Sequence, residues 1–239
     1  MILITRPKTE SKLLQNKLAD LGYVSVIESL SSFKFNKQEI NNIQKKIILI
    51  SSPRATKILL EKKLLRPDTL FLVIGKSSAL RLKKSGLKNI IYTASNSELM
   101  LKYIKRNFKN ITKNGSYNIC YCTSNVSNKI FLKQLEMLRV SKVIIYKTVF
   151  KKNLSKKTVQ LIKNNKIKIC LLYSQENAKR FIKLIHSHDL YKNAKNIVFL
   201  SLSKKIANYI INEGLSKSIC ALRPNQKSLI AKLGKSKVL

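Results

Sequence analysis

The sequence is poor in the residue types that build metal centres and carboxylate-based active sites. Its 239 residues include no tryptophan, two histidines and only 11 aspartates and glutamates. The histidines and the four cysteines lack the spacing of metal ligands, so the sequence predicts no metal site. The shortage of acids also weakens one interpretation, a two-domain sugar-binding or glycosyltransferase-like protein, because such sites usually hold the sugar or a metal with carboxylates.

Long hydrophobic runs are absent as well. Hydrophobic residues make up 44% of the chain, but no apolar run approaches the roughly 18 residues of a membrane span. The N-terminal segment lacks the basic and then apolar pattern of a signal peptide. We therefore expect a cytoplasmic protein without a membrane partner, with reduced and buried thiols. The cysteines lie in or beside apolar runs, at Cys120, Cys122, Cys170 and Cys220.

Charge of one sign dominates the composition. There are 48 lysines and arginines, and the formal net charge is +37. A basic nucleic-acid-binding protein would explain this charge. However, the lysines are spread over nearly every expected helix and loop, and the tyrosines and phenylalanines stand at core-like positions, which disfavours base stacking. Two other interpretations remain open: a biased, AT-rich coding sequence, or a substrate with many carboxylates that a basic cleft attracts and binds.

The most informative stretch runs from Leu72 to Leu87. A short apolar run ends at Gly75, the polar residues Lys76, Ser77 and Ser78 follow, and a helical pattern then begins. This pattern predicts a strand, a tight turn and a helix. Such a turn directs backbone N–H groups, an ammonium group and two hydroxyls to one place, which favours an anion. An ordinary connection with capping serines remains the alternative.

This stretch has a counterpart in the second half of the chain. The segment Phe199–Leu215 repeats its pattern, and Gly214 matches Gly86 at a distance of 128 residues. The segments before the two copies repeat as well, with Ser52 matching Ser174. One long βαβαβα pattern therefore occurs twice, which predicts two similar α/β domains facing each other.

Two segments are expected to connect the domains. Ser31–Asn36 shows no clear periodicity, and Val140–Val149 is a long strand at the opposite place in the repeat order. A short helix or polar connection is expected at Ile40–Lys46, and the residues after Gly234 are expected to fray. The sequence His186-Ser187-His188 is expected to end a helix rather than to form a site.

A combination of motifs extends over nearly the whole chain: ILITRP at the N-terminus, then SSPRA, VIGKSSALRLKKSGL, SNSELM, VIIYKTV and LLYSQENA, with a closing unit that ends in NEGL. In this combination and order the chain resembles the uroporphyrinogen-III synthase family. The resemblance implies two similar parallel-sheet α/β domains joined by a two-stranded antiparallel linker. Residues 1–32 plus 151–239 would form a discontinuous domain, and residues 33–150 an inserted one. The repeat alone suggests two tandem halves; the discontinuous arrangement comes only from the resemblance.

The resemblance also implies a reaction, the cyclisation of hydroxymethylbilane to uroporphyrinogen III with inversion of ring D and loss of water, in porphyrin and heme biosynthesis. Loss of water gives an azafulvene, and the family is thought to proceed through a spiro-pyrrolenine that fragments and recloses. No cofactor is implied; the partners are the substrate and, by handover, hydroxymethylbilane synthase, and the protein would be a monomer that binds no nucleic acid. This chemistry needs the substrate to be folded, water to be excluded and the leaving hydroxide to be assisted.

The candidate site residues lie at strand ends and helix starts, where open α/β sheets bind ligands. By position, Tyr146 and Tyr173 are the catalytic candidates, with packing as the alternative role for both. The candidate substrate-binding residues are Thr5, Arg6, Ser51, Ser52, Lys76, Ser77, Ser78, Ser97, Ser174, Lys204 and Lys205.

A plain structural role stays open for several of these candidates. Arg6 would clamp a carboxylate or lie in an exposed turn, and Ser52 and Ser174 would donate to carboxylates or only cap helices. The turn Ser203–Ala207 lacks the glycine and the threonine of the family pattern. One of the two lysines in that turn would replace the missing hydroxyl, or this half of the chain would contribute less to binding.

Overall fold

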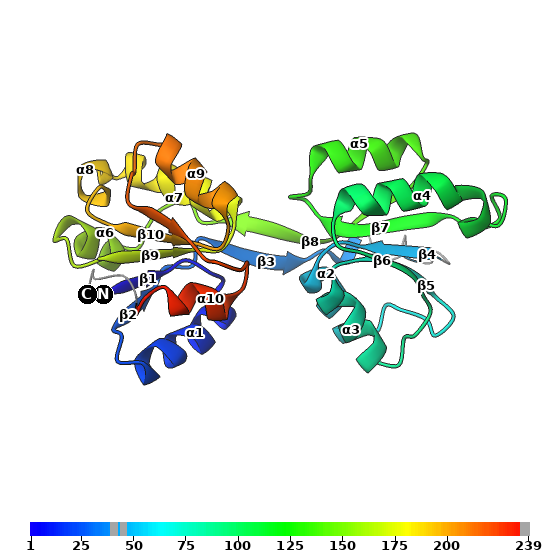
Figure 1. Ribbon diagram of the computed structural model, residues 1–239, viewed down its shortest axis with the longest axis horizontal. Helices are drawn as coiled ribbons and strands as arrows, with labels where there is room; N and C mark the ends of the chain where they lie inside the picture. Colours follow the sequence, from blue (N-terminus) through cyan, green and yellow to red (C-terminus); the bar gives the residue numbers. More distant parts are fainter. Residues whose placement is uncertain (39–42, 44–46, 235–239) are drawn as a thin grey trace. The chain divides into compact units, whose positions relative to one another are not determined.

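The computed structural model describes residues 1–38, 43 and 47–234, in which strands and helices alternate along most of the chain (Figure 1). The strands are β1 (Ile2–Ile4), β2 (Ser25–Ile27), β3 (Ser31–Phe35), β4 (Ile47–Ile50), β5 (Leu70–Ile74), β6 (Ile90–Ala94), β7 (Ile119–Ser124), β8 (Ser141–Phe150), β9 (Ile169–Leu172), β10 (Val198–Ser201) and β11 (Ser218–Cys220). The helices are α1 (Lys8–Asp20), α2 (Pro53–Glu61), α3 (Lys76–Lys84), α4 (Ser97–Ile111), α5 (Lys129–Met137), α6 (Lys156–Lys163), α7 (Gln175–Ser187), α8 (Tyr191–Ala194), α9 (Lys204–Asn212) and α10 (Gln226–Ala231). The connection expected at Ile40–Lys46, apart from Ile43, and the residues after Gly234 lie outside the described residues.

The chain divides into two compact units. Unit 1 combines Met1–Ser32 with Val149–Leu239, and unit 2 is Phe33–Thr148. Each unit contains a sheet with helices on both of its faces, which is the arrangement expected when buried parallel strands alternate with helices.

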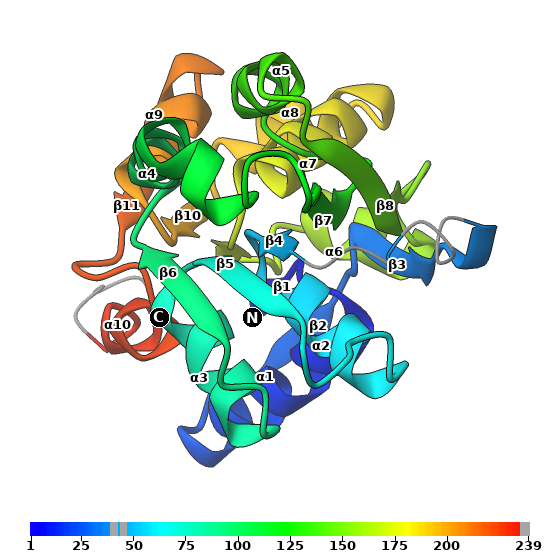
Figure 2. The same cartoon turned by 90° about the vertical axis from the view of Figure 1, so that its right-hand side faces the viewer.

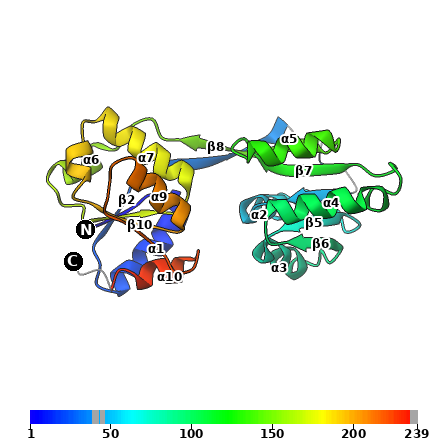
Figure 3. The same cartoon turned by 45° about the horizontal axis from the view of Figure 1, so that its top comes forward.

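The sheet of unit 1 has five parallel strands in the order β11-β10-β9-β1-β2. Helices α7 and α9 cover one face, and α1 and α10 lie side by side on the other (Figures 1 and 3). Successive residues of β1 point to opposite faces, as the pleat requires. Leu3 therefore packs with Phe181 and Phe199 on the first face, whereas Ile4 packs with Leu14 on the second.

The sheet of unit 2 has the order β3-β8-β7-β4-β5-β6, and the strands from β4 to β8 pair in parallel. Helices α2 and α3 cover one face, and α4 and α5 the other (Figure 1). Within β4, Ile48 and Ile50 pack under the first pair of helices, and Ile47 and Leu49 pack under the second. The alternating side chains of one short strand thus contribute to both hydrophobic cores of unit 2.

The two sheets have the same strand arrangement with different chain connections. The order β8-β7-β4-β5-β6 in unit 2 becomes β2-β1-β9-β10-β11 in unit 1 when the N-terminal strands are placed after the C-terminal ones. The matched residues take the same roles: Ser52 and Ser174 both cap helices, and Gly86 and Gly214 both have positive φ, 83° and 79°. The repeat predicted from the sequence is confirmed at these positions.

The four cysteines, all of them in the described part of the chain, form no disulfide. Cys120 and Cys122 lie on one face of β7 with their sulfurs 3.9 Å apart. Burial raises the pKa of the Cys170 thiol well above its usual value. The expectation of burial is wrong for Cys220, which is half-buried because β11 is the outermost strand of its sheet.

The left-handed backbone at two glycines of unit 1 can be tested by substitution with alanine. Gly22 and Gly214 share a φ of 79°. A methyl group added at Gly22 would have no described atom within 4 Å, whereas one added at Gly214 would clash with the Tyr191 hydroxyl. We expect each glycine-to-alanine change to cost about 1–2 kcal/mol for the left-handed backbone. Gly214→Ala should cost about 1 kcal/mol more, because the hydrogen bond from Tyr191 to the Glu213 carbonyl must break. Urea unfolding measures both costs, and equal values would contradict this account.

Candidate functional site

The carboxyl ends of β1 and β9 bring predicted site residues of unit 1 together. The two strands are neighbours, with Ile4 opposite Leu171. The helix after β1 leads to β2 on one side of this pair of strands, and the helix after β9 leads to β10 on the other side. Open α/β sheets bind ligands at the carboxyl ends of strands where the order reverses in this way. Arg6 and Tyr173 both lie at this reversal.

Arg6 is held by three neighbours. Its guanidinium donates from Nη1 to Gln226 Oε1 at 2.7 Å and from Nη2 to Glu10 Oε2 at 2.5 Å. Its central carbon lies 4.4 Å from the centre of the Tyr173 ring. About a quarter of the side chain is exposed (24%). The guanidinium has five N–H donors, of which these two bonds use two, so it is fixed in place and still reachable by a ligand.

Tyr173 lies half-buried at the end of β9. Burial raises the pKa of its hydroxyl to about 12, although the positive charge of Arg6 acts in the opposite direction. A phenol with this pKa keeps its proton at neutral pH. Tyr173 therefore carries a hydrogen-bond donor rather than a base, and its hydroxyl oxygen is buried within the described structure.

Thr5 and Ser174, the residues beside this pair, already have structural partners. The Thr5 hydroxyl is fully buried and donates to the Leu171 carbonyl at 2.7 Å. The Ser174 hydroxyl caps α7 by accepting from the Asn177 backbone at 3.2 Å. Because a capping hydroxyl accepts, its own proton remains free to be donated elsewhere.

Unit 2 places Ser51 and Ser52 at the end of β4. Ser51 Oγ is 2.6 Å from the Tyr121 hydroxyl. Ser52 caps α2 by accepting from the Ala55 backbone at 3.0 Å, and its oxygen is 3.4 Å from the Tyr146 hydroxyl. Tyr146 is 7% exposed and its ring packs edge to face with a phenylalanine ring from β3, a contact of the kind that the packing alternative describes.

The start of α3 separates the three residues that the sequence grouped there. Gly75 has a φ of 96° and stands at the helix N-cap, which explains the glycine at this turn. Lys76 and Ser77 are exposed, whereas Ser78 is fully buried. Within the part of the chain that the structure describes, the Ser78 hydroxyl has no hydrogen-bond partner.

Two other predicted positions also lie at helix starts. Ser97 is half-buried in the first turn of α4, after the Asn96 cap. Lys204 and Lys205 are exposed in the first turn of α9, after Ser203, whose side chain makes no capping bond. The altered turn of this half therefore presents two cations.

A family model described as uroporphyrinogen-III synthase HemD matches residues 12–231, most of the chain. The chain belongs to the uroporphyrinogen-III synthase family. It is an enzyme of tetrapyrrole biosynthesis, and the family acts on hydroxymethylbilane. Among curated proteins no sequence matches it.

Solved structures of uroporphyrinogen-III synthases share the fold. The chain matches uroporphyrinogen-III synthetase from Helicobacter pylori with a TM-score of 0.64 and 15% identity, over 98% of both chains. It matches a mutant synthase from Thermus thermophilus with a TM-score of 0.64 and 10% identity, also over 98% of both chains. The wild-type Thermus enzyme in another crystal form gives 0.51 and 10%, over 100% of this chain and 97% of the other. At these identities the likeness concerns the mixed α/β fold with parallel sheets.

The sequence did not reveal the residues that hold the candidate site of this synthase in place. Gln226 and Glu10 fix Arg6, and Tyr121 contacts Ser51. One sequence signal was present for Gln226. The residues at the start of its helix, α10, repeat the pattern at the start of α4. The pairing of Gln226 with Arg6 joins residues 220 positions apart, which no local pattern specifies.

Asn125, also missed, ties the end of β7 to β8. Its Oδ1 accepts from the Thr148 backbone at 2.7 Å, and its Nδ2 donates to the Thr148 carbonyl at 3.3 Å. The polar turn after a buried strand was the available signal. These two hydrogen bonds of one side-chain amide fix the end of β7 beside Ser51 and Ser52.

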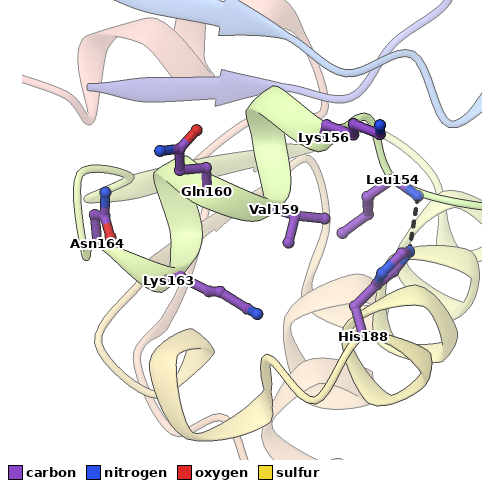
Figure 4. Close-up of a pocket in the computed structure, with 7 residues that line it drawn as sticks. All are labelled: Leu154, Lys156, Val159, Gln160, Lys163, Asn164 and His188. Carbon is purple, nitrogen blue, oxygen red and sulfur yellow. Dashed lines mark hydrogen bonds between the residues drawn. The ribbon is translucent and has the colours of Figure 1, made fainter.

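A cavity of about 360 Å³ contains none of the predicted synthase site residues (Figure 4). It lies along α6, with Leu154 and Val159 on its apolar side and His188 at the end of α7. The His188 Nε2 accepts from the Leu154 backbone at 3.2 Å, and this histidine lies at the end of its helix, as the sequence predicted. The described residues include no cluster of metal-binding side chains, and none of the described helices is long and apolar enough to span a membrane.

Proposed function

We propose that Arg6 and Tyr173 bind and activate hydroxymethylbilane at the carboxyl ends of β1 and β9. The observation that carries this proposal is the guanidinium of Arg6, held by Glu10 and Gln226 against the Tyr173 ring and still partly exposed. A planar guanidinium binds a carboxylate through two parallel hydrogen bonds. Because Arg6 is already fixed, little side-chain entropy is lost when the substrate binds.

Tyr173 supplies a proton donor next to that anchor. When the hydroxymethyl C–O bond breaks, its electron pair leaves with the oxygen as hydroxide, and the electron pair of the pyrrole nitrogen forms an azafulvenium ion. The hydroxide then takes the pyrrole N–H proton, which gives water and the neutral azafulvene. The Tyr173 hydroxyl donates a hydrogen bond to the leaving oxygen and stabilises the charge that develops there. A pKa of about 12 suits this donation better than complete proton transfer at neutral pH.

The remaining predicted residues bind or support the carboxylates. The exposed lysines, Lys76, Lys204 and Lys205, and the hydroxyls of Ser51, Ser52, Ser77, Ser97 and Ser174 are the proposed contacts. Thr5 and Ser78 are fully buried, so we assign them to the support of the loops rather than to direct contact. Tyr146 packs behind Ser52.

Units 1 and 2 are proposed to be the two domains of this enzyme, joined by β3 and β8 as a two-stranded antiparallel linker. Two backbone bonds support this assignment: Lys151 donates to Leu30, and Asn36 donates to Ile145. As the residue number rises on one strand it falls on the other, which is the pattern of antiparallel pairing. The cytoplasmic location, the monomeric state and the handover from hydroxymethylbilane synthase stay predictions.

The first experiment supplies hydroxymethylbilane to the purified protein and separates the products. We expect uroporphyrinogen III in excess over isomer I, the spontaneous product. Product composed of isomer I alone would overturn the proposed function.

The second experiment tests the site through Arg6→Ala. Loss of the guanidinium removes a charge-assisted bond to a substrate carboxylate, so we expect kcat/KM for isomer III to fall about tenfold, equivalent to about 1.4 kcal/mol. Arg106→Ala, at an exposed position of α4, is the control and should leave kcat/KM within twofold. Tyr173→Phe should lower kcat more than it changes KM. Equal kinetics for the two arginine variants would remove Arg6 from the site.

A further inference from the structure

An open cavity of about 510 Å³ lies along one edge of unit 2. It is formed by the outward side of α3, the end of β6 and the start of α4; β6 is the last strand of its sheet, with α3 on one side and α4 on the other (Figure 2). We call it the edge cleft. The proposed function uses one of its lining residues, Lys76, and leaves the others unexplained.

The wall of the edge cleft is apolar. Leu80 from α3 and Leu99 from α4 line it, although they are 58% and 43% exposed. Tyr92 also lines it, and its ring is stacked on Tyr103 with centroids 3.9 Å apart and planes 8° apart. The stack limits the freedom of Tyr92. Exposed leucines beside a fixed aromatic ring offer a flat surface to a planar apolar group.

The charge of the edge cleft is of one sign. Lys76 and Lys83 line it from the same face of α3, two turns apart, which separates their backbones by roughly 10 Å. None of the described residues that line it is acidic. Gly75 begins α3 without a side-chain cap, so the partial positive charge of the helix start adds to that of Lys76. The wall therefore suits an apolar ring, and its two ends suit anions.

We propose that the edge cleft is a subsite for one pyrrole of the substrate, with the ring against Leu80, Tyr92 and Leu99 and its carboxylates at Lys76 and Lys83. The assignment rests on the proposed function, because it takes a pyrrole with two carboxylates as the ligand. It names Lys83, Tyr92 and Leu99 as substrate-binding residues that the sequence did not indicate.

Charge reversal at Lys83 tests the subsite directly. The probe is a monopyrrole carrying one acetate and one propionate, titrated into the full-length protein and followed by NMR. We expect Lys83→Glu to weaken binding of this probe at least tenfold, and a monopyrrole without carboxylates to bind no variant measurably. Lys84→Glu is the matched control: Lys84 is the next residue of the same helix, equally exposed and outside the cleft lining, so binding should stay within twofold of wild type.

Turnover gives the second measurement. Lys83→Glu should raise KM for hydroxymethylbilane about fivefold and leave kcat within twofold, because the subsite binds the ground state and the transition state alike. Equal KM values for Lys83→Glu and Lys84→Glu, or a wild-type protein that does not bind the probe at millimolar concentration, would overturn the subsite. Wild-type protein that forms only isomer I overturns the proposed function instead, so the two failures are distinguishable.

Discussion

Phe181→Ala is expected to destabilise unit 1 by about 3–5 kcal/mol, the usual cost of removing a fully buried phenylalanine. Phe181 lies on α7 and is 0% exposed. Its ring meets the edge of Phe199 on β10, with centroids 6.1 Å apart. The truncation therefore leaves a cavity beneath α7, the helix capped by Ser174, where substrate binding is proposed. Urea unfolding followed by circular dichroism measures the loss.

A surface truncation in the same unit provides the comparison. Leu13 on α1 is 70% exposed, so Leu13→Ala should change the free energy of unfolding by no more than about 0.5 kcal/mol. Phe181→Leu should fall between the two variants, because most of the cavity is refilled. A loss below about 1 kcal/mol for Phe181→Ala would show that the ring is not packed as the structure has it.

Glu28→Gln is expected to cost about 2–3 kcal/mol at neutral pH, because it removes a buried carboxylate that accepts several hydrogen bonds. Glu28 is 1% exposed and lies where the chain leaves β2. It accepts from the Lys151 ammonium, from the Ser155 hydroxyl at 2.5 Å and from the Ser155 backbone at 3.1 Å. The matched control is Glu176→Gln, an exposed ion pair with Lys179 that should cost no more than about 1 kcal/mol.

The pH dependence of this cost follows from the direction of the Glu28 pKa. Burial alone would raise the pKa, but the hydrogen bonds from Lys151 and Ser155 outweigh burial, and the pKa lies below its ordinary value of 4.5. A carboxyl group whose pKa is lowered by folding stabilises the folded state above its unfolded pKa, and this stability is lost as the pH falls through the folded pKa. The difference in the free energy of unfolding between wild type and Glu28→Gln should therefore have its full value at pH 7 and shrink below about pH 4.5. A difference that does not change between pH 7 and pH 3 would contradict the lowered pKa.

Local chemistry explains the parts of the fold that the sequence predicted. Ser52 and Ser174 precede helices because a serine hydroxyl satisfies free N–H groups at a helix start, and both do so in the structure. Gly86 follows α3 and has positive φ, which only glycine adopts at little cost. Short-range rules of this kind act within a few residues, so one sequence is enough to apply them.

Strand pairing and side-chain burial follow different rules. β1 pairs with β9 across more than half of the chain, and nothing local to Ile2–Ile4 selects that partner. The residues of the repeat indicated tandem halves, and only the family resemblance indicated a discontinuous unit. In the site, strand ends pointed to Arg6 and Tyr173, but the burial of Ser78 depends on which face of α3 meets the sheet, and the contact of Gln226 with Arg6 depends on the completed fold.

The permuted strand order of unit 1 has a consequence for synthesis. The segment β1–α1–β2 leaves the ribosome first, yet its partner β9 follows only after all of Phe33–Thr148 has been made. The intervening segment is contiguous in the chain and can fold during translation. The N-terminal segment keeps its apolar surface exposed until β9 has been synthesised. Strands β3 and β8, by which the chain enters and leaves that segment, are paired. Folding of the segment therefore holds the N-terminal and C-terminal parts of unit 1 near each other, which lowers the entropy cost of joining them.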